Sequence, residues 1–468
     1  MKYIQCIILY VCFIGTTKAE TKLPNFFSDS MVLQQQMSVP IWGTDKPSTI
    51  ITIKSSWGKY AKTITDINGN WKTKLLTTKA GGPFKIIISG TTKIEYNNVL
   101  VGEVWLCSGQ SNMEMPVRGN MNQPVLGSNE AILNSTNNTI RCFTAKRNVS
   151  VTNATVINGA WVAASPATTG SFSAVAYFFA KKIQATTGIP VGIIHTSWGA
   201  SNIEAWMDSI SISTVLKVVT PEKVTMANAN TTHTMLYKSM LHPFIGYGIK
   251  GMLWYQGEGN RARAAEYQKL FSLLIQSWRG QWQQGNFPFY FTQIAPHSGL
   301  PNNTINGAYL REAQLKTMQA VENTGMVVTL DIGEQYMIHP ANKETVGNRL
   351  AYWALAKDYN IKGLSYCGPV YNKIEYIRND TIALSFKYAE LGLNSFGKTL
   401  TDFEIAGEDK VYYPANAFFA KGKPEWVAVT SEKVKNPVHV RYAFSNWVVG
   451  SLYNTQGLPA SSFRTDDW

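Results

Sequence analysis

The feature that most limits how this chain folds is an apolar run that passes directly into a small polar turn. Residues 101–107 are mostly apolar, and a Ser-Gly-Gln-Ser-Asn segment follows at 108–112. Such a run is typical of a strand buried on both faces, as in a parallel sheet. Gly109 allows a sharp turn, so we expect Ser111 at the carboxyl edge of the sheet with its hydroxyl exposed. That position suits a nucleophile.

The middle of the chain, from residue 101 to about residue 364, alternates strand-like and helix-like patterns. Residues 192–195 and 251–255 have the composition of buried strands, whereas 172–184 and 265–278 have helical periodicity. This alternation predicts an α/β domain in which a mostly parallel sheet has helices on both faces. Ligands of such sheets bind at the carboxyl ends of the strands.

Short strand-like runs and turns flank this middle part on both sides. We therefore expect an N-terminal β-rich domain at 20–100, the catalytic α/β domain at 101–365 and a C-terminal β-rich domain at 366–468. Residues 1–19 combine a lysine at position 2, an apolar run and small residues before position 20. This pattern predicts a cleaved signal peptide and an exported protein, either periplasmic or secreted.

Composition narrows the classes of partner. The formal net charge is +13, but the basic residues are scattered, which argues against nucleic acid and mildly favours an anionic sugar. No apolar stretch beyond the signal is long enough to cross a membrane. Beyond residue 19 the cysteines are Cys107, Cys142 and Cys367, an odd and widely spaced set. We expect neither a disulfide framework nor a metal site from them.

Acyl transfer by a serine needs a base that takes the hydroxyl proton. His339 lies in a polar loop at 334–340, between a predicted strand at 325–331 and a predicted helix at 342–356. This loop belongs to the same edge of the sheet as Ser111. We therefore predict that the two side chains meet.

Two further strand ends offer donors for an oxyanion hole. The segment 196–201 contains Gly199, whose backbone N–H can approach a ligand closely, and 256–260 contains the amides of Gln256 and Asn260. Either segment alone is typical of a glycine turn in any α/β sheet. Together with the serine and histidine loops, they predict one reaction site.

These segments resemble a known family. The runs GQSNME at 109–114, HTSWG at 195–199, WYQGEGN at 254–260 and IHP at 338–340 are similar to the four blocks of SGNH hydrolases, in the form carried by sialate O-acetylesterases. Similarity extends into the flanking regions, for example at 457–468, and so covers nearly the whole chain after residue 19.

The resemblance implies a role for each matching residue. Ser111 would be the nucleophile and His339 the general base. The N–H groups of Ser111 and Gly199, with an amide from either Gln256 or Asn260, would form the oxyanion hole. The reaction would pass through an acetyl-enzyme and would need no metal or organic cofactor.

One position departs from the family pattern. Many relatives carry an aspartate two residues before the histidine, but Met337 stands there in this chain. A thioether cannot stabilise an imidazolium as a carboxylate does. Asp331 and Glu334 are the nearest replacements, and we favour Asp331 because a strand end is held more rigidly than a loop. The alternative is a dyad whose imidazole is oriented by a backbone carbonyl.

The expected substrate is an O-acetylated sugar, and the resemblance implies sialic acid. The same catalytic parts serve an acetylxylan esterase or another polysaccharide acetyl esterase, so this alternative stays open. A non-catalytic glycan-binding protein that has lost the triad acid is the alternative from another class.

Overall fold

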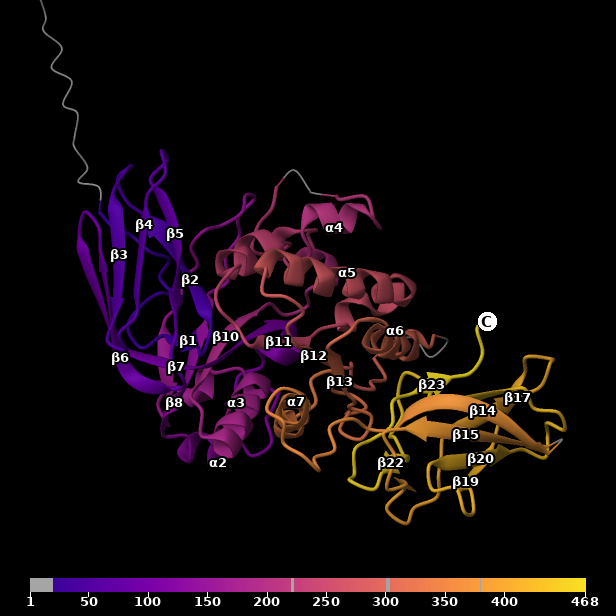
Figure 1. Cartoon of the computed structure of the whole chain (residues 1–468). Helices are drawn as coiled ribbons and strands as arrows, with labels where there is room; N and C mark the ends of the chain where they lie inside the picture. The colour runs from indigo at the N-terminus through magenta and orange to yellow at the C-terminus, as the bar shows by residue number, and fades with distance from the viewer. Residues whose placement is uncertain (1–19, 220–222, 300–303, 379) are drawn as a thin grey trace, which may run out of the picture.

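The computed structural model describes residues 20–219, 223–299, 304–378 and 380–468, so the predicted signal peptide lies outside the described residues. Its centre is a sheet with the strand order β13-β12-β11-β7-β10-β8-β9 (Figure 1). Every neighbouring pair along this path is parallel except β8 and β9. The strands are β7 (Lys93–Gly109), β8 (Asn137–Thr144), β9 (Trp161–Ala164), β10 (Val191–Ser197), β11 (Gly251–Tyr255), β12 (Phe289–Thr292) and β13 (Thr324–Val327).

Strand β7 lies where the strand order reverses. After β7 the chain forms β8, β9 and β10 on one side of it, and then β11, β12 and β13 on the other. Loops that leave the two neighbours of such a strand turn in opposite directions, which opens a crevice at the carboxyl ends of the strands. Because β7 ends at Gly109, Ser111 emerges at this reversal point.

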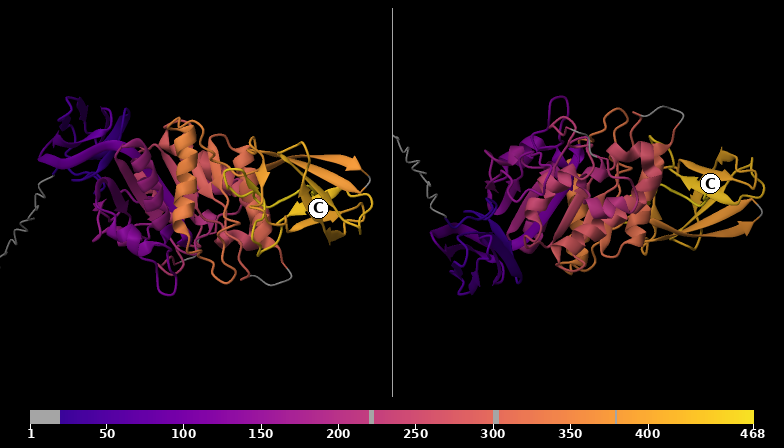
Figure 2. Two further views of the ribbon diagram at one scale, coloured as in Figure 1. Left: turned by 90° about the horizontal axis from the view of Figure 1, so that it is seen from below. Right: turned by 90° about the horizontal axis from the view of Figure 1, so that it is seen from above.

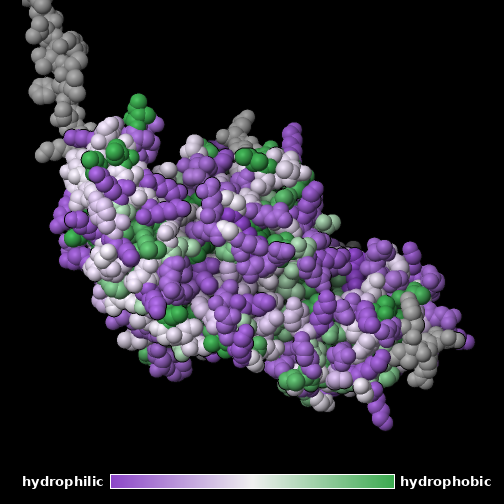
Figure 3. All heavy atoms as spheres, in the orientation of Figure 1, coloured by the Kyte–Doolittle hydropathy of each residue, from purple (hydrophilic) through white to green (hydrophobic). Residues whose placement is uncertain are grey.

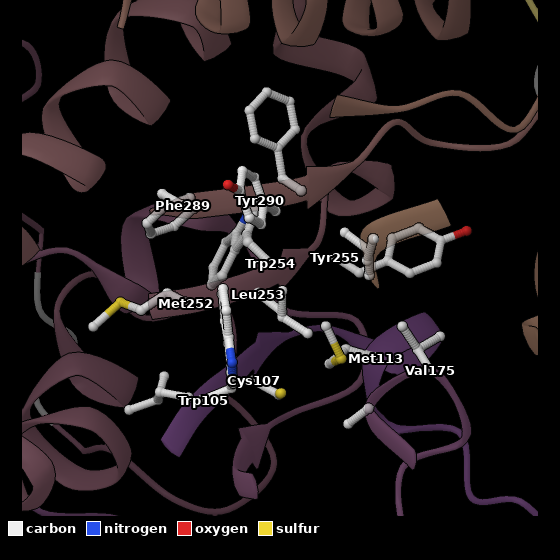
Figure 4. Close-up of a cluster of buried hydrophobic side chains, with 14 of the residues drawn as sticks. Trp105, Cys107, Met113, Val175, Met252, Leu253, Trp254, Tyr255, Phe289 and Tyr290 are labelled. Carbon is white, nitrogen blue, oxygen red and sulfur yellow. The ribbon is translucent and has the colours of Figure 1, made fainter. Parts of the chain in front are cut away.

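Helices cover both faces of the sheet. Helices α3 (Ala174–Thr187) and α7 (Lys343–Lys357) pack against each other on one face, and α5 (Ala264–Trp282) and α6 (Asn306–Ala320) on the other (Figure 1). Figure 4 shows large side chains that fill the interior around β7, β11 and β12, among them Trp105, which is fully buried. An aromatic residue buries roughly 150–250 Å² in such a position. The predicted α/β class is confirmed.

The N-terminal β-rich segment is continuous with the central sheet through β7. The first part of β7 pairs with β6 in antiparallel direction, and its middle pairs with β1 in parallel direction. Towards its carboxyl end, β7 pairs with β10 and β11. The expected domain boundary between residues 100 and 101 therefore falls inside one strand. The other strands of this segment are paired as β3 with β4 and β6, and as β2 with β5. The bounds are β1 (Val32–Gln34), β2 (Ser38–Thr44), β3 (Ile50–Ser55), β4 (Tyr60–Ile64), β5 (Asn70–Leu76) and β6 (Gly81–Ser89).

The C-terminal residues form a second β-rich module at the opposite end of the molecule (Figure 2). Its sheets have the orders β14-β15-β20-β19, β18-β17-β21-β23 and β16-β22. The bounds are β14 (Val370–Arg378), β15 (Thr381–Lys387), β16 (Leu393–Asn394), β17 (Phe403–Ala406), β18 (Tyr412–Pro414), β19 (Asn416–Phe419), β20 (Trp426–Thr430), β21 (His439–Tyr442), β22 (Tyr453–Asn454) and β23 (Phe463–Arg464).

An ionic cluster ties this module to the central domain. Asp466, whose side chain is fully buried, pairs with Arg441 at 2.8 Å and with Arg464 at 2.9 Å, and Arg464 also pairs with Glu312 of α6 at 2.9 Å. Burial acts to raise the pKa of the Asp466 carboxyl, but hydrogen bonds from Arg441 and Tyr412 outweigh it and lower the pKa to about 2. The carboxylate therefore stays charged down to low pH.

The surface and the sulfur chemistry are unremarkable. The face in Figure 3 is mostly hydrophilic, with scattered apolar side chains. Cys107, Cys142 and Cys367 are buried and unpaired.

Within the described ranges no helix is long and apolar enough to cross a membrane. The same ranges hold no cluster of three or more His, Cys, Asp or Glu side chains arranged to bind a metal.

We expect Asp466→Asn to lower the free energy of unfolding by about 2–4 kcal/mol at neutral pH, because it leaves the largely buried Arg441 without its counter-charge and Arg464 with Glu312 alone. The difference from wild type is expected above about pH 4 and to shrink as the pH falls towards 2, because the native carboxylate is then protonated. Urea unfolding of wild type and variant at several pH values across this range measures the difference in the free energy of unfolding. The control is Glu375→Gln, which breaks an exposed ion pair with Lys373. It is expected to change stability little, and an equal loss in both variants would contradict the prediction.

Candidate active site

The sharp end of β7 presents Ser111. At Gly109, φ is 141°, and an added Cβ would lie 2.2 Å from the carbonyl oxygen of Tyr255 on β11, so only glycine fits there. The backbone N–H of Gln110 donates to that same carbonyl at 2.9 Å. Helix α1 (Ser111–Glu114) begins at the next residue. The half-buried Ser111 therefore stands at the carboxyl edge of the sheet.

His339 lies beside Ser111 although 228 residues separate them in the chain. The distance from His339 Nε2 to Ser111 Oγ is 2.7 Å. A general base needs this contact to take the hydroxyl proton. Burial, and then the positive charge of Lys343 and the nearby His297, lower the pKa of His339 to about 4. Its imidazole is therefore uncharged at neutral pH and able to accept a proton.

A buried polar network lies next to this pair and centres on Asn112. The Asn112 amide donates to Glu258 Oε1 at 2.6 Å and to the carbonyl of Ile338 at 3.1 Å. Its oxygen accepts a hydrogen bond from Lys343 Nζ at 2.5 Å. Burial raises the pKa of Glu258 and lowers that of Lys343 to about 7, and the attraction between the two groups opposes both shifts. Because Ile338 directly precedes His339, the network fixes the backbone beside the imidazole.

Asp331 makes neither a hydrogen bond nor an ion pair with the imidazole of His339 in this structure. Strand β13 ends at Val327, so Asp331 lies in the following loop rather than at a strand end. Its two carboxylate oxygens accept hydrogen bonds from Arg349 of α7 at 2.8 and 2.6 Å. The expectation that Asp331 orients His339 is corrected on this point, because the arginine takes its carboxylate.

The two alternatives to Asp331 were Glu334 and a backbone carbonyl, and among the described residues neither forms a hydrogen bond with the imidazole. Glu334 accepts a hydrogen bond from the backbone N–H of Ala341 at 2.7 Å and so shapes its own loop. In the part of the chain that the structure describes, the only hydrogen bond of the His339 ring is the one to Ser111. The His339 ring is thus placed by its bond to Ser111 and by the backbone anchoring at Ile338.

The predicted backbone donors of the oxyanion hole differ in availability. The N–H of Ser111 has no acceptor among the described residues. The N–H of Gly199 donates to Glu114 Oε2 at 2.7 Å. The predicted donor at Gly199 is therefore occupied by a carboxylate of the same chain.

The side-chain amides of the loop after β11 are engaged in its support. Gln256 is fully buried and donates to the carbonyl of Ser201 at 3.0 Å and to Asn260 Oδ1 at 2.8 Å. The Asn260 amide donates to Glu204 Oε2 at 3.0 Å. Gln256 therefore has no N–H left for an oxyanion, which removes one of the two amides predicted as alternatives. The amides of both residues connect this loop to the segment after β10.

Glu114 and Arg147 belong to this site, and sequence reasoning assigned them no role. Glu114 Oε1 accepts from Arg147 Nε at 3.0 Å and Nη2 at 2.7 Å, and Oε2 accepts from Nη2 at 2.8 Å. Glu114 is the last residue of the GQSNME run at 109–114, which is the one local signal for it. Its contacts reach 33 residues along the chain to Arg147 and 85 residues to Gly199, so no local pattern reports them.

Comparison with known proteins agrees with this geometry. A family profile described as "Carbohydrate esterase, sialic acid-specific acetylesterase" matches residues 101–356, more than half of the chain. The chain belongs to this family. It is therefore a carboxylic ester hydrolase, and the predicted family is confirmed.

Relatives of this esterase extend the match to the flanking modules. A sialate O-acetylesterase from Homo sapiens is 26% identical over 94% of this chain and 92% of its own length. The same enzyme from Rattus norvegicus is 28% identical over 78% of this chain and 79% of its own length. The crystal structure of a carbohydrate acetylesterase from Xanthomonas citri is 35% identical, with a TM-score of 0.88, and the match covers 96% of this chain and 100% of that one.

We expect Asp331→Asn to lower kcat of this esterase by less than tenfold, since the Asp331 carboxylate binds Arg349 rather than His339. Loss of the acid in a Ser-His-Asp triad lowers kcat by about 10,000-fold. Stability is expected to fall by about 3 kcal/mol, because the largely buried Arg349 loses its partner. Steady-state hydrolysis of a chromogenic acetate ester, with urea unfolding of the same variant, separates the effects. A loss of kcat near that of Ser111→Ala would contradict this expectation.

Proposed function

We propose that this esterase removes O-acetyl groups from sialic acids. The sialic acid-specific description of the family and the names of the mammalian relatives support the substrate. The formal net charge of +13 suits a sugar that carries a carboxylate. The observation that carries the chemistry is the 2.7 Å contact between His339 Nε2 and Ser111 Oγ.

In the proposed reaction, Ser111 Oγ attacks the acetyl carbonyl while His339 Nε2 takes its proton. The tetrahedral intermediate collapses to an acetyl-enzyme, and the sugar hydroxyl leaves with the proton held by His339. Water then gives a proton to His339 and attacks the acetyl group, which releases acetate and restores Ser111. Because the pKa of His339 is low, its imidazole is uncharged at neutral pH and Nε2 can accept the proton.

Another sugar ester is the second candidate. The protein from Xanthomonas citri is described as a carbohydrate acetylesterase without mention of sialic acid, and it is 35% identical. An acetylxylan or other polysaccharide acetyl esterase would use the same Ser111 and His339. The non-catalytic glycan-binding alternative is disfavoured by family membership and by the Ser111–His339 contact.

We expect the enzyme to release acetate from an O-acetylated sialic acid with a kcat/KM at least about tenfold above that for acetylated xylan, a preference worth about 1.4 kcal/mol. Ser111→Ala is expected to abolish turnover on both, because the nucleophile is lost. Enzymatic determination of acetate measures the two rates. Activity on xylan alone would contradict the sialate substrate, and equal product from wild type and Ser111→Ala would contradict catalysis by this site.

We also propose that residues 1–19 are removed during export. This proposal rests on their sequence, since they lie outside the described residues. The mature chain is expected to begin at Glu20 when it is recovered from the periplasm or the medium. Intact-mass measurement of that material tests the position, and recovery of the chain only inside the cell, starting at Met1, would contradict export.

A further inference from the structure

Glu114 and Arg147 bring a pair of opposite charges to the nucleophile. A Cβ placed on Gly199 would lie 3.1 Å from Glu114 Oε2, 3.5 Å from Ser111 Cβ and 3.9 Å from Arg147 Nη2. The carboxylate, the guanidinium and the serine therefore surround one backbone position. This is the position whose N–H donates to Glu114 at 2.7 Å.

A carboxylate in this place opposes the reaction. The tetrahedral intermediate carries a negative oxygen that needs N–H donors beside Ser111. Glu114 occupies the Gly199 donor and adds a like charge on the side of that donor, near Ser111. The arrangement therefore stabilises the resting enzyme relative to the transition state. The rate of acyl transfer is expected to rise when Glu114 releases the Gly199 N–H.

Arg147 is the group that now holds Glu114 beside Gly199. Its side chain is 45% exposed, and the guanidinium lies 5.0 Å from the centre of the buried Trp198 ring, which supports it from one side. Nε and Nη2 bind Glu114, whereas Nη1 has no partner within the described residues. An exposed ion pair contributes little net stability, so a second carboxylate can compete for this arginine.

We propose that Arg147 binds the carboxylate of the O-acetylated sialic acid, displaces Glu114 from its ion pair and thereby frees the Gly199 N–H for the oxyanion. This inference rests on the sialate function proposed above and makes Arg147 and Glu114 specificity-determining residues. A planar guanidinium suits the substrate carboxylate because it offers two parallel donors. A neutral sugar acetate has no group to exchange with Glu114 and meets the enzyme with the donor occupied.

The first test compares an O-acetylated sialic acid with its methyl ester, in which the carboxylate charge is removed. We expect wild type to favour the free acid by about 10- to 100-fold in kcat/KM, as for loss of a charge-assisted hydrogen-bond pair. Arg147→Gln is expected to bring this ratio close to one. Lys146→Gln removes the same charge from the neighbouring exposed residue and is expected to keep the wild-type ratio.

The second test uses 4-nitrophenyl acetate, which carries neither a sugar nor a carboxylate. Glu114→Ala vacates the Gly199 N–H and is expected to raise kcat/KM on this ester by about 3- to 10-fold, a modest share of the effect of one oxyanion donor. An unchanged or lower value would overturn the competition between Glu114 and the oxyanion. Circular dichroism of each variant checks that the fold is kept.

The two proposals fail in different ways. If wild type cleaves the free acid and the methyl ester equally well, the sialate function stands and the role of Arg147 is overturned. If wild type cleaves 4-nitrophenyl acetate but neither sialate form, the sialate function fails and this inference fails with it. A free-acid preference that persists in Arg147→Gln also overturns the assignment of Arg147.

Discussion

The structure depends on one buried strand that is hydrogen-bonded along both edges. From Val99 to Gly109 strand β7 is buried throughout, and from Trp105 onward it pairs with β10 on one side and β11 on the other. The backbone N–H and C=O groups of a strand in this position pair with the adjacent strands. Where two strands approach closely, there is no room for a side chain. The close approach at Gly109 ends the strand, and this termination sets Ser111 at the reversal point of the sheet.

The catalytic pair is held by buried polar contacts rather than by a carboxylate on the imidazole. Asn112 follows the nucleophile directly and bonds to Glu258, to Lys343 and to the backbone just before His339. Buried charges need their partners, since an unpaired one costs several kcal/mol. The loop that carries His339 is therefore tied to the end of β7 through Asn112 as well as through the bond between His339 and Ser111. This tie explains how His339 keeps its place although Met337 stands where the resemblance implies an aspartate.

Much of this arrangement was predictable because it depends on local pattern. Apolar runs and helical spacing identified the α/β class, and the strand-end segments identified the serine and histidine that meet at 2.7 Å. The supporting partners were not predictable. Asp331 was favoured for its place near a strand end, but β13 ends four residues earlier, and Arg349 of α7 takes the carboxylate. Gln256 and Asn260 were left as alternative donors, but the Gln256 amide donates to Ser201 and Asn260.

The amino-acid sequence by itself determined which segments become strands and helices, and hence which chemical groups reach the carboxyl edge of the sheet, because periodicity and turn chemistry act over a few residues. Only the tertiary structure decided which group each of them contacts there. The bonds from Gly199 and Arg147 to Glu114 join residues far apart in the chain, on loops that meet only once the strands are in register. A hydrogen bond depends on tenths of an ångström between such loops, and no local pattern carries that distance.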